Sequence, residues 1–211
     1  MASRRLIRWS GLAAMLGGLL WMVLGHLQGM AESTKVLGLT EGAYNRMNTA
    51  SLLLLTAGLA GLYARQAGRF GRLGLAGLVL AFIGLALMVL GNVIEFWISD
   101  LIFADVQPGE FKPGAHAGIG SFLVGLVLLS VGLVLFGIAT IRAKVLPRWS
   151  RVLPLIIGLL LASGFLVALS IGEWGFGVII LSLGLGWMLL GYVVWSDQPE
   201  APVQSGVRPP I

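Results

Sequence analysis

Six long runs of apolar residues alternate with short polar segments along the chain. The runs cover residues 7–27, 47–64, 73–98, 117–141, 152–171 and 175–195. Each is close to the ~20 residues that carry an α-helix across the hydrocarbon core of a bilayer. A membrane-spanning strand would need only ~10 residues with strict alternation, whereas these runs are apolar on every side. The pattern therefore predicts an all-α membrane protein with six transmembrane helices in one domain, residues 1–198.

Two further expectations concern the ends of these elements. The second run is the shortest, so we expect its helix to begin earlier, near Tyr44. The polar, proline-containing residues 199–211 are expected to form a disordered cytoplasmic tail. The first run is longer than the 7–15-residue apolar core of a signal peptide, so we expect it to be retained as a span.

The segments between the runs alternate in charge, which predicts an orientation. Basic residues gather before the first run and in every second loop: Arg4, Arg5, Arg8, Arg65, Arg69, Arg72, Arg142, Lys144, Arg148 and Arg151. The intervening loops and run ends carry most of the acids: Glu32, Glu41, Glu95, Asp100, Asp105, Glu110 and Glu173. Because cytoplasmic loops are enriched in Lys and Arg, both termini are predicted to be cytoplasmic, in a plasma (inner) membrane.

Composition excludes several other classes of protein. Hydrophobic residues make up 57% of the 211 residues and charged residues only 11%, whereas soluble domains contain about 25% charged residues. There is no cysteine, so thiolate chemistry and disulfides are excluded. The net charge of +5 arises in membrane loops and forms no continuous basic face, so nucleic acid is not an expected partner.

The loop pattern also divides the chain into three helical hairpins, residues 1–66, 67–144 and 145–198. Met-Val-Leu-Gly occurs at 22–25 and again at 88–91, and the glycines at 11, 18 and 25 match those at 77, 84 and 91 at the same offset. This suggests a threefold repeat of one packing unit. A chain built mostly from Leu, Gly, Ala and Val also produces such matches by chance, so both interpretations stay open.

The 31 glycines follow helical spacing within the spans. In the third and fourth runs they recur every seven residues and mark one helix face: Gly77, Gly84, Gly91, Gly118, Gly125 and Gly132. Small residues allow transmembrane helices to approach closely. We therefore expect glycine-mediated helix packing, and a possible interface with a protein partner or with a second copy of the chain.

No ionisable residue lies in the middle of any run. Pumps and ion-coupled transporters usually carry such residues within the membrane, and hydrolases need a nucleophile beside a base. The sequence therefore predicts a non-enzymatic protein with no catalytic residue and no cofactor, in contact with the lipid bilayer.

The remaining polar residues gather at the run ends on the predicted outer side. Glu95 continues the glycine spacing of the third run and should face the bundle interior. A candidate ligand-binding cluster follows: His26, Arg46, Asn48, Asn92, Glu95 and Glu173. The alternative is an ion pair between Glu95 and Arg46 that only satisfies charges at the membrane boundary.

His26 and His116 are also candidates for the two axial ligands of a haem. The signal is weak, because His116 is displaced by about 200° around its helix from the glycine face, at 100° per residue. A metal site of histidine and carboxylate is equally weakly indicated, since two histidines follow no ligand spacing.

Two segments carry a family resemblance: Arg-Trp-Ser-Gly-Leu-Ala-Ala-Met-Leu-Gly-Gly-Leu-Leu-Trp at 8–21 and Leu-Pro-Arg-Trp-Ser at 146–150. The chain resembles small six-span integral membrane proteins of bacteria with high genomic GC content. This resemblance covers the layout of the whole chain and implies a bacterial inner membrane, but no reaction.

Three functions are consistent with these patterns. The first is an accessory or assembly-type helical bundle that packs with itself or a partner through its glycine faces. The second is a facilitator or binder of a small molecule or lipid at the polar cluster around Glu95. The third and weakest is a haem-binding redox subunit.

Overall fold

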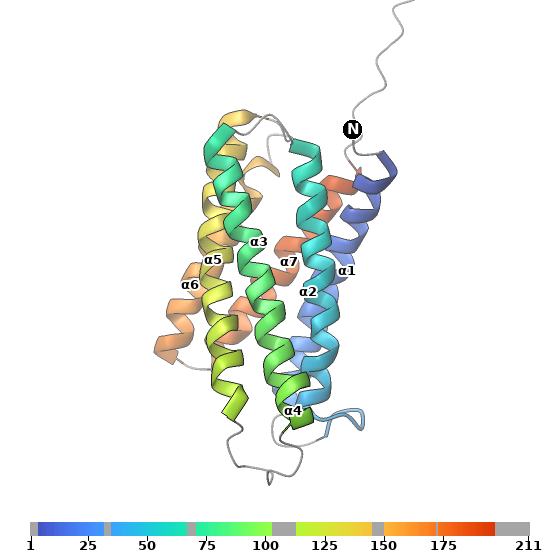
Figure 1. The fold of residues 1–211 in the computed structure, drawn as a ribbon. Coiled ribbons are helices and arrows are strands. Elements are labelled where there is room, and N and C mark those ends of the chain that lie inside the picture. Colours follow the sequence, from blue (N-terminus) through green and yellow to red (C-terminus); the bar gives the residue numbers. More distant parts are fainter. Residues whose placement is uncertain are drawn as a thin grey trace, which may run out of the picture.

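The chain folds into six long helices that run up and down beside one another (Figure 1). The computed structural model describes residues 4–31, 35–66, 71–102, 113–144, 150–171 and 173–196. The long helices are α1 (Arg4–Met30), α2 (Glu41–Gln66), α3 (Gly71–Val93), α5 (Pro113–Ala143), α6 (Leu153–Ile171) and α7 (Glu173–Ser196). Three short elements complete the fold: the π-helical turn η1 (Ile94–Ile98), α4 (Ser99–Ile102) and the 3-10 turn η2 (Ser150–Val152).

The prediction of six membrane-spanning helices is confirmed. All six are long and apolar enough to cross a bilayer, and the described residues contain no strand beyond an isolated bridge between Val36 and Leu39. The second helix begins at Glu41, well before the apolar run at 47–64, because polar residues continue the helix past the hydrocarbon boundary. The predicted tail, 199–211, lies outside the described residues.

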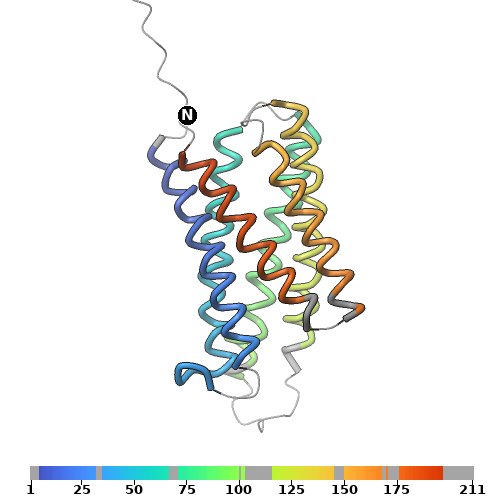
Figure 2. The backbone as a smooth tube through the Cα atoms, turned by 180° about the vertical axis from the view of Figure 1, so that it is seen from behind, coloured from blue at the N-terminus to red at the C-terminus, as the bar shows by residue number. Residues whose placement is uncertain are grey.

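The six long helices form a closed ring. Each packs on the next one along the chain, and α7 returns to pack on α1. Figure 2 shows α7 crossing beside α1, with the N-terminal end of α1 and the C-terminal end of α7 at the same end of the bundle. We call this the basic end, after Arg5, Arg65 and Arg142, and the other the acidic end, after Glu41 and Glu95.

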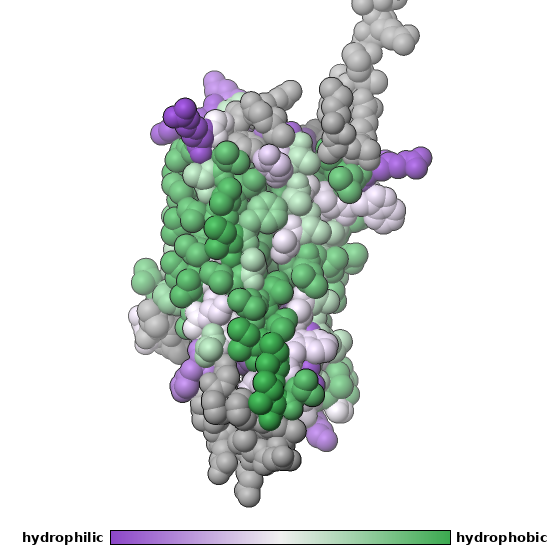
Figure 3. Space-filling view, viewed as in Figure 1, coloured by the Kyte–Doolittle hydropathy of each residue, from purple (hydrophilic) through white to green (hydrophobic). Residues whose placement is uncertain are grey.

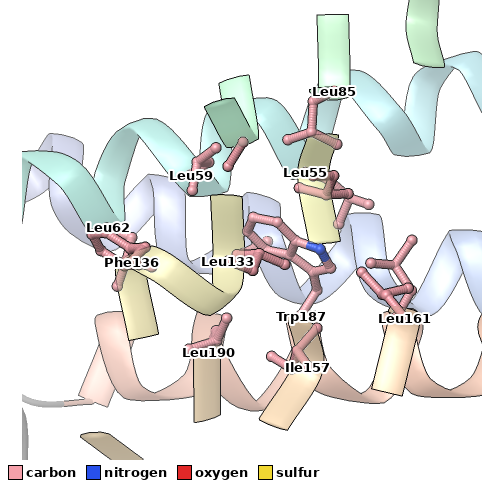
Figure 4. Packing of buried hydrophobic residues seen from close by; sticks show 14 of the residues in the cluster. Leu55, Leu59, Leu62, Leu85, Leu133, Phe136, Ile157, Leu161, Trp187 and Leu190 are labelled. Atoms are coloured by element: carbon pink, nitrogen blue, oxygen red, sulfur yellow. The ribbon is translucent and has the colours of Figure 1, made fainter. Parts of the chain in front are cut away.

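Large apolar side chains fill the inside of the ring. Leu55 and Leu59 from α2, Leu133 and Phe136 from α5, and Trp187 from α7 are at most 1% exposed. Figure 4 shows these side chains meeting from different helices, so the centre is a packed core. On the outside, the face in Figure 3 carries a broad apolar band between hydrophilic ends, as expected for a surface that contacts lipid.

Helix α3 lies against α5 along facing glycines. Gly77 faces Gly132, Gly84 faces Gly125, and Gly91 faces Gly118. An added Cβ at Gly84 would lie 2.6 Å from the carbonyl oxygen of Gly125, and one at Gly125 would lie 2.6 Å from that of Gly84. Neither helix can therefore carry a larger residue there without moving away from its partner. Backbone approach of this kind gains van der Waals and Cα–H···O contacts.

Helices α1 and α7 approach each other in the same way. Gly11 faces Gly191 and Gly18 faces Gly184, with the carbonyl oxygen of Gly184 2.5 Å from an added Cβ at Gly18. We call these two glycine-lined contacts, α3 with α5 and α1 with α7, the glycine seams. In both seams the helices run antiparallel and the facing glycines recur every seven residues. The glycine pattern of α1 therefore has the same use as that of α3, namely close contact with one neighbouring helix.

The two seams join different kinds of neighbours. The glycines of α3 face the returning helix of the same predicted hairpin, whereas those of α1 face α7 of the third hairpin. Matching sequence positions therefore have partners at different places in the chain. The threefold repeat remains a prediction. If it exists, its first and second hairpins use their matching glycines to contact different helices.

Two polar contacts hold the basic end together. Arg65 Nη1 donates a hydrogen bond of 2.7 Å to the carbonyl oxygen of Val193, which links α2 to α7. The buried Thr140 on α5 lies 3.1 Å from Gln66 Oε1 on α2. These contacts connect α2 to one helix of each glycine-lined pair, namely α7 and α5.

Gly84→Leu is expected to destabilise the protein strongly, because the leucine side chain would overlap the α5 backbone. Overpacking typically costs about 1–3 kcal/mol and can cost more. Thermal unfolding in detergent measures the loss. The matched control is Gly120→Leu on α5, where an added Cβ meets nothing within 4 Å; equal melting temperatures for the two variants would contradict this packing.

Candidate functional site

Buried polar side chains gather at the acidic end of the bundle. Asn45, Asn48 and Ser51 lie on α2, and Asn92 lies near the end of α3, each at most 5% exposed. Within a membrane, buried polar groups need partners, because the surrounding hydrocarbon offers none. We refer to Asn48, Asn92, Glu95 and their hydrogen-bond partners as the polar cluster.

A chain of hydrogen bonds joins α2 to α3 within this cluster. The hydroxyl of Thr49 donates to Asn92 Oδ1 at 2.6 Å, and it accepts from Trp97 Nε1 at 3.2 Å. The Thr49 hydroxyl thus donates its single proton to Asn92 and accepts the Trp97 N–H with a lone pair. The chain fixes the Asn92 amide so that its oxygen is turned towards α2.

A second contact lies within α2. Ser51 Oγ lies in hydrogen-bond contact with Asn48 Oδ1 and 2.6 Å from the carbonyl oxygen of Asn48. This contact satisfies a buried hydroxyl without help from another helix. It holds the Asn48 side chain along its own helix, on the buried face of α2.

Helix α3 changes geometry where it reaches the acidic end. Residues Ile94–Ile98 form the π-helical turn η1, and the N–H of Ser99 donates to the carbonyl oxygen of Ile94, five residues earlier. Such turns occur frequently at functional sites, because the wider turn redirects side chains. The turn contacts α2 and α5 as well as α3, so it lies where three helices meet.

Glu95 lies in this turn and is half-buried. An added Cβ at Gly118 would lie 2.6 Å from the Cβ of Glu95, so the glycine at 118 makes room for this residue against α5. Burial removes part of the hydration of the carboxylate, and the Glu41 carboxylate adds repulsion. A cation or hydrogen-bond donor placed here would stabilise the charge of Glu95.

Two aromatic rings lie one helical turn deeper in the bundle. Phe122 follows Gly118 by four residues on α5, and its ring stacks on that of Trp21 from α1, with centroids 6.2 Å apart and planes at 6°. We call this pair the aromatic floor. Trp21 is 4% exposed, and its Nε1 has no acceptor among the described residues.

Of the six predicted cluster residues, Asn48 and Asn92 are buried and Glu95 is half-buried. His26 and Arg46 are exposed, and Arg46 Nε donates to the carbonyl oxygen of Gly42 in its own helix. The ion pair between Arg46 and Glu95, suggested as the alternative, stays a prediction. The Glu173 side chain lies outside the described part of the structure.

Several members of the site have no signal in the sequence. Thr49 and Ser51 are ordinary small polar residues in a helix, and Trp21 and Phe122 are ordinary apolar residues of their runs. Trp97 is an aromatic residue at the end of its run, a position typical of membrane-boundary anchors. Their roles follow from which helices become neighbours, and a single sequence does not contain that information.

The geometry does not favour the haem pair. His26 on α1 and His116 on α5 are both exposed, and these helices lie on different sides of the bundle in Figure 1. Within the described residues, no three or more His, Asp or Glu side chains are grouped so that they could hold a metal ion. The imidazoles therefore do not face one common gap.

No protein-family model matches the chain, and no curated protein or solved structure is significantly similar to it. The functional argument therefore depends on the site itself. Its distinctive features are the half-buried carboxylate of Glu95 and the buried, hydrogen-bonded amides of Asn48 and Asn92 at one end of an apolar core.

Thr49→Val is expected to lower the stability of the protein by about 0.5–2 kcal/mol, because Asn92 and Trp97 both lose their shared partner. Chemical or thermal unfolding in detergent measures this loss. Thr56→Val is the control, since the Thr56 hydroxyl bonds only the Leu52 carbonyl oxygen of its own helix at 2.8 Å. A Thr49→Val protein as stable as the Thr56→Val protein would argue against the hydrogen-bond chain.

Proposed function

We propose that this multi-pass membrane protein is non-enzymatic and binds a small molecule or a lipid head group in the polar cluster at its acidic end. The observation that carries the proposal is the placement of Asn48, Asn92 and Glu95 at one end of a bundle whose centre is apolar. Interhelical hydrogen bonds alone account for Thr49 and Asn92. They do not account for the half-buried carboxylate of Glu95, which packs against Gly118 of α5.

Binding is favoured over conduction because the inside of the ring is filled. Leu52, Leu55 and Leu59 are fully buried along α2, and the aromatic floor connects α1 to α5 below the cluster. A polar solute that enters from the acidic end would therefore meet apolar side chains rather than a continuous polar path. This supports binding at one end of the bundle rather than passage through it.

The glycine seams are less suited to a partner protein than the sequence suggests. Gly77, Gly84 and Gly91 face their counterparts on α5, so their surface is used within the chain. An accessory or assembly role through these glycines is therefore disfavoured. A partner would have to bind other side chains on the lipid-facing surface.

We also propose that the protein resides in a plasma (inner) membrane with both termini in the cytoplasm. The support is the gathering of Arg5, Arg65 and Arg142 at the end that carries both termini, as the positive-inside rule requires. In this orientation the polar cluster lies at the outer side of the membrane.

The absence of cysteine allows a direct test of this orientation. Lys35→Cys is exposed at the acidic end and Ser196→Cys at the basic end. A membrane-impermeant thiol reagent applied to intact cells should label the first variant and label the second only after lysis. The reverse pattern would show that the termini face outwards.

Glu95→Gln is expected to abolish ligand retention while the protein remains folded, because the neutral amide keeps the size of the side chain and loses its charge. Native mass spectrometry of protein extracted in mild detergent should show bound lipid or small molecules on the wild type and fewer on this variant. Thr140→Val removes a buried polar contact at the basic end and is the control. Equal retention by all three proteins would sink the proposed function.

A further inference from the structure

We propose that the basic end of the α1·α7 seam binds the phosphate group of an anionic phospholipid through Arg5 and Arg8 of α1, beside Tyr192 and Trp195 of α7. We call these four residues the phosphate site. The N-terminal end of α1 and the C-terminal end of α7 lie at the opposite end of the bundle from the polar cluster (Figure 2). The phosphate site therefore does not rest on binding at that cluster.

The last contact of the α1·α7 seam fixes the position of Trp195. An added Cβ at Gly11 would lie 2.8 Å from the backbone nitrogen of Trp195 and 3.0 Å from its Cβ. The Trp195 side chain therefore leaves α7 directly against α1. The Tyr192 ring lies beside it, one turn earlier on α7, with ring centroids 6.4 Å apart. The seam thus places two aromatic rings next to the first turns of α1.

Arg8 reaches across the seam to these rings. It lies three residues before Gly11 on α1, and its guanidinium carbon is 6.0 Å from the centre of the Trp195 ring. A guanidinium within about 6 Å of an indole is attracted to the face of the ring. This attraction leaves N–H donors of the guanidinium available, and their planar fork matches two oxygens of a phosphate group.

The phosphate site lies on one side of the seam, and this side faces lipid. Because the two helices are antiparallel, the residue that follows a facing glycine turns to the same side in both of them. Leu19, Leu185 and Tyr192 each follow a seam glycine by one position, and all three are exposed. By the 100° step of a helix, Arg5 and Arg8 lie on that side too. Figure 2 views the bundle from this side, with α1 and α7 in front.

The surface next to the phosphate site is suited to acyl chains. Leu185 lies two turns inward from Tyr192 on α7, and Leu19 lies three turns inward from Arg8 on α1. Their exposed side chains carry the apolar surface from the membrane boundary towards the middle of the bilayer. A ligand with a phosphate at the boundary and hydrocarbon chains beneath it matches this order of charged, aromatic and apolar groups.

Charge favours an anionic phospholipid over a zwitterionic one. Arg4, Arg5 and Arg8 lie close together in the chain, and the acid nearest to Trp195 in the sequence is Asp197. Three arginines with one carboxylate leave a net positive charge, which repels the ammonium group of a zwitterionic head group. In the proposed orientation this end faces the cytoplasmic leaflet, whose surface is negative because it contains anionic lipids.

The experiment titrates three compounds into the full-length protein in detergent micelles and measures the melting temperature, which rises when a ligand binds the folded state. The compounds are phosphatidylglycerol, phosphatidylethanolamine with identical acyl chains, and glycerol phosphate, which carries the phosphate without chains. We expect the largest rise with phosphatidylglycerol, because it alone combines a net negative charge with acyl chains.

Arg8→Gln should weaken the apparent affinity for phosphatidylglycerol by at least about tenfold, because it removes charge-assisted hydrogen bonds to the phosphate. Arg8→Lys keeps the charge and loses the planar fork, so it should weaken this affinity by about threefold. The matched control is Arg142→Gln, which removes an exposed arginine of α5 at the same end of the bundle and should bind like the wild type.

Tyr192→Phe keeps the ring beside Trp195 and removes one exposed hydroxyl, so it should weaken the affinity by about threefold. This variant tests the site even if Arg8 also stabilises the contact between α1 and α7, a role that the melting temperatures without lipid reveal.

Three results would overturn the inference. Equal rises with phosphatidylglycerol and phosphatidylethanolamine would show that the net charge of the lipid is not recognised. An equal rise with glycerol phosphate would show a site for free phosphate instead of a lipid. A loss in Arg142→Gln as large as that in Arg8→Gln, or no loss in Arg8→Lys, would reduce the effect to the general positive charge of the basic end.

Discussion

Close approach of helix backbones at facing glycines is the constraint on which the rest of this bundle depends. In lipid, no hydrophobic effect pushes apolar helices together, so association relies on contacts that lipid tails cannot match. Gly84 against Gly125 and Gly18 against Gly184 supply such contacts in the two seams. With α3 held on α5 and α1 held on α7, the remaining helices complete the ring.

The register of the α3·α5 seam also positions the site. Gly77, Gly84 and Gly91 follow one another at intervals of seven, and the same face continues into the π-helical turn that carries Glu95. Gly118 thus contacts both Gly91 and Glu95. A shift of one turn between these helices would move Gly118 away from Glu95 and Phe122 away from Trp21.

The polar residues that join helices at the basic end serve the structure, whereas those at the acidic end include the candidate binding residues. Thr140 and Arg65 at the basic end join helices through hydrogen bonds to amide oxygens, and they need no ligand. At the acidic end, Thr49 serves the same purpose between Asn92 and Trp97. Glu95 at this end is half-buried against Gly118, and the proposed binding site is centred on it.

The sequence by itself determined the six helices, their approximate bounds and the apolar midplane, because hydrophobic length and helix formation in lipid are properties of each segment alone. It also indicated Glu95 as inward-facing, since its spacing continues that of the glycines. Only the tertiary structure decided that α1 packs on α7, that α3 ends in a π-helical turn, and that Trp21 meets Phe122. These features depend on contacts between distant segments, and many such pairings are compatible with the same pattern of apolar and small residues.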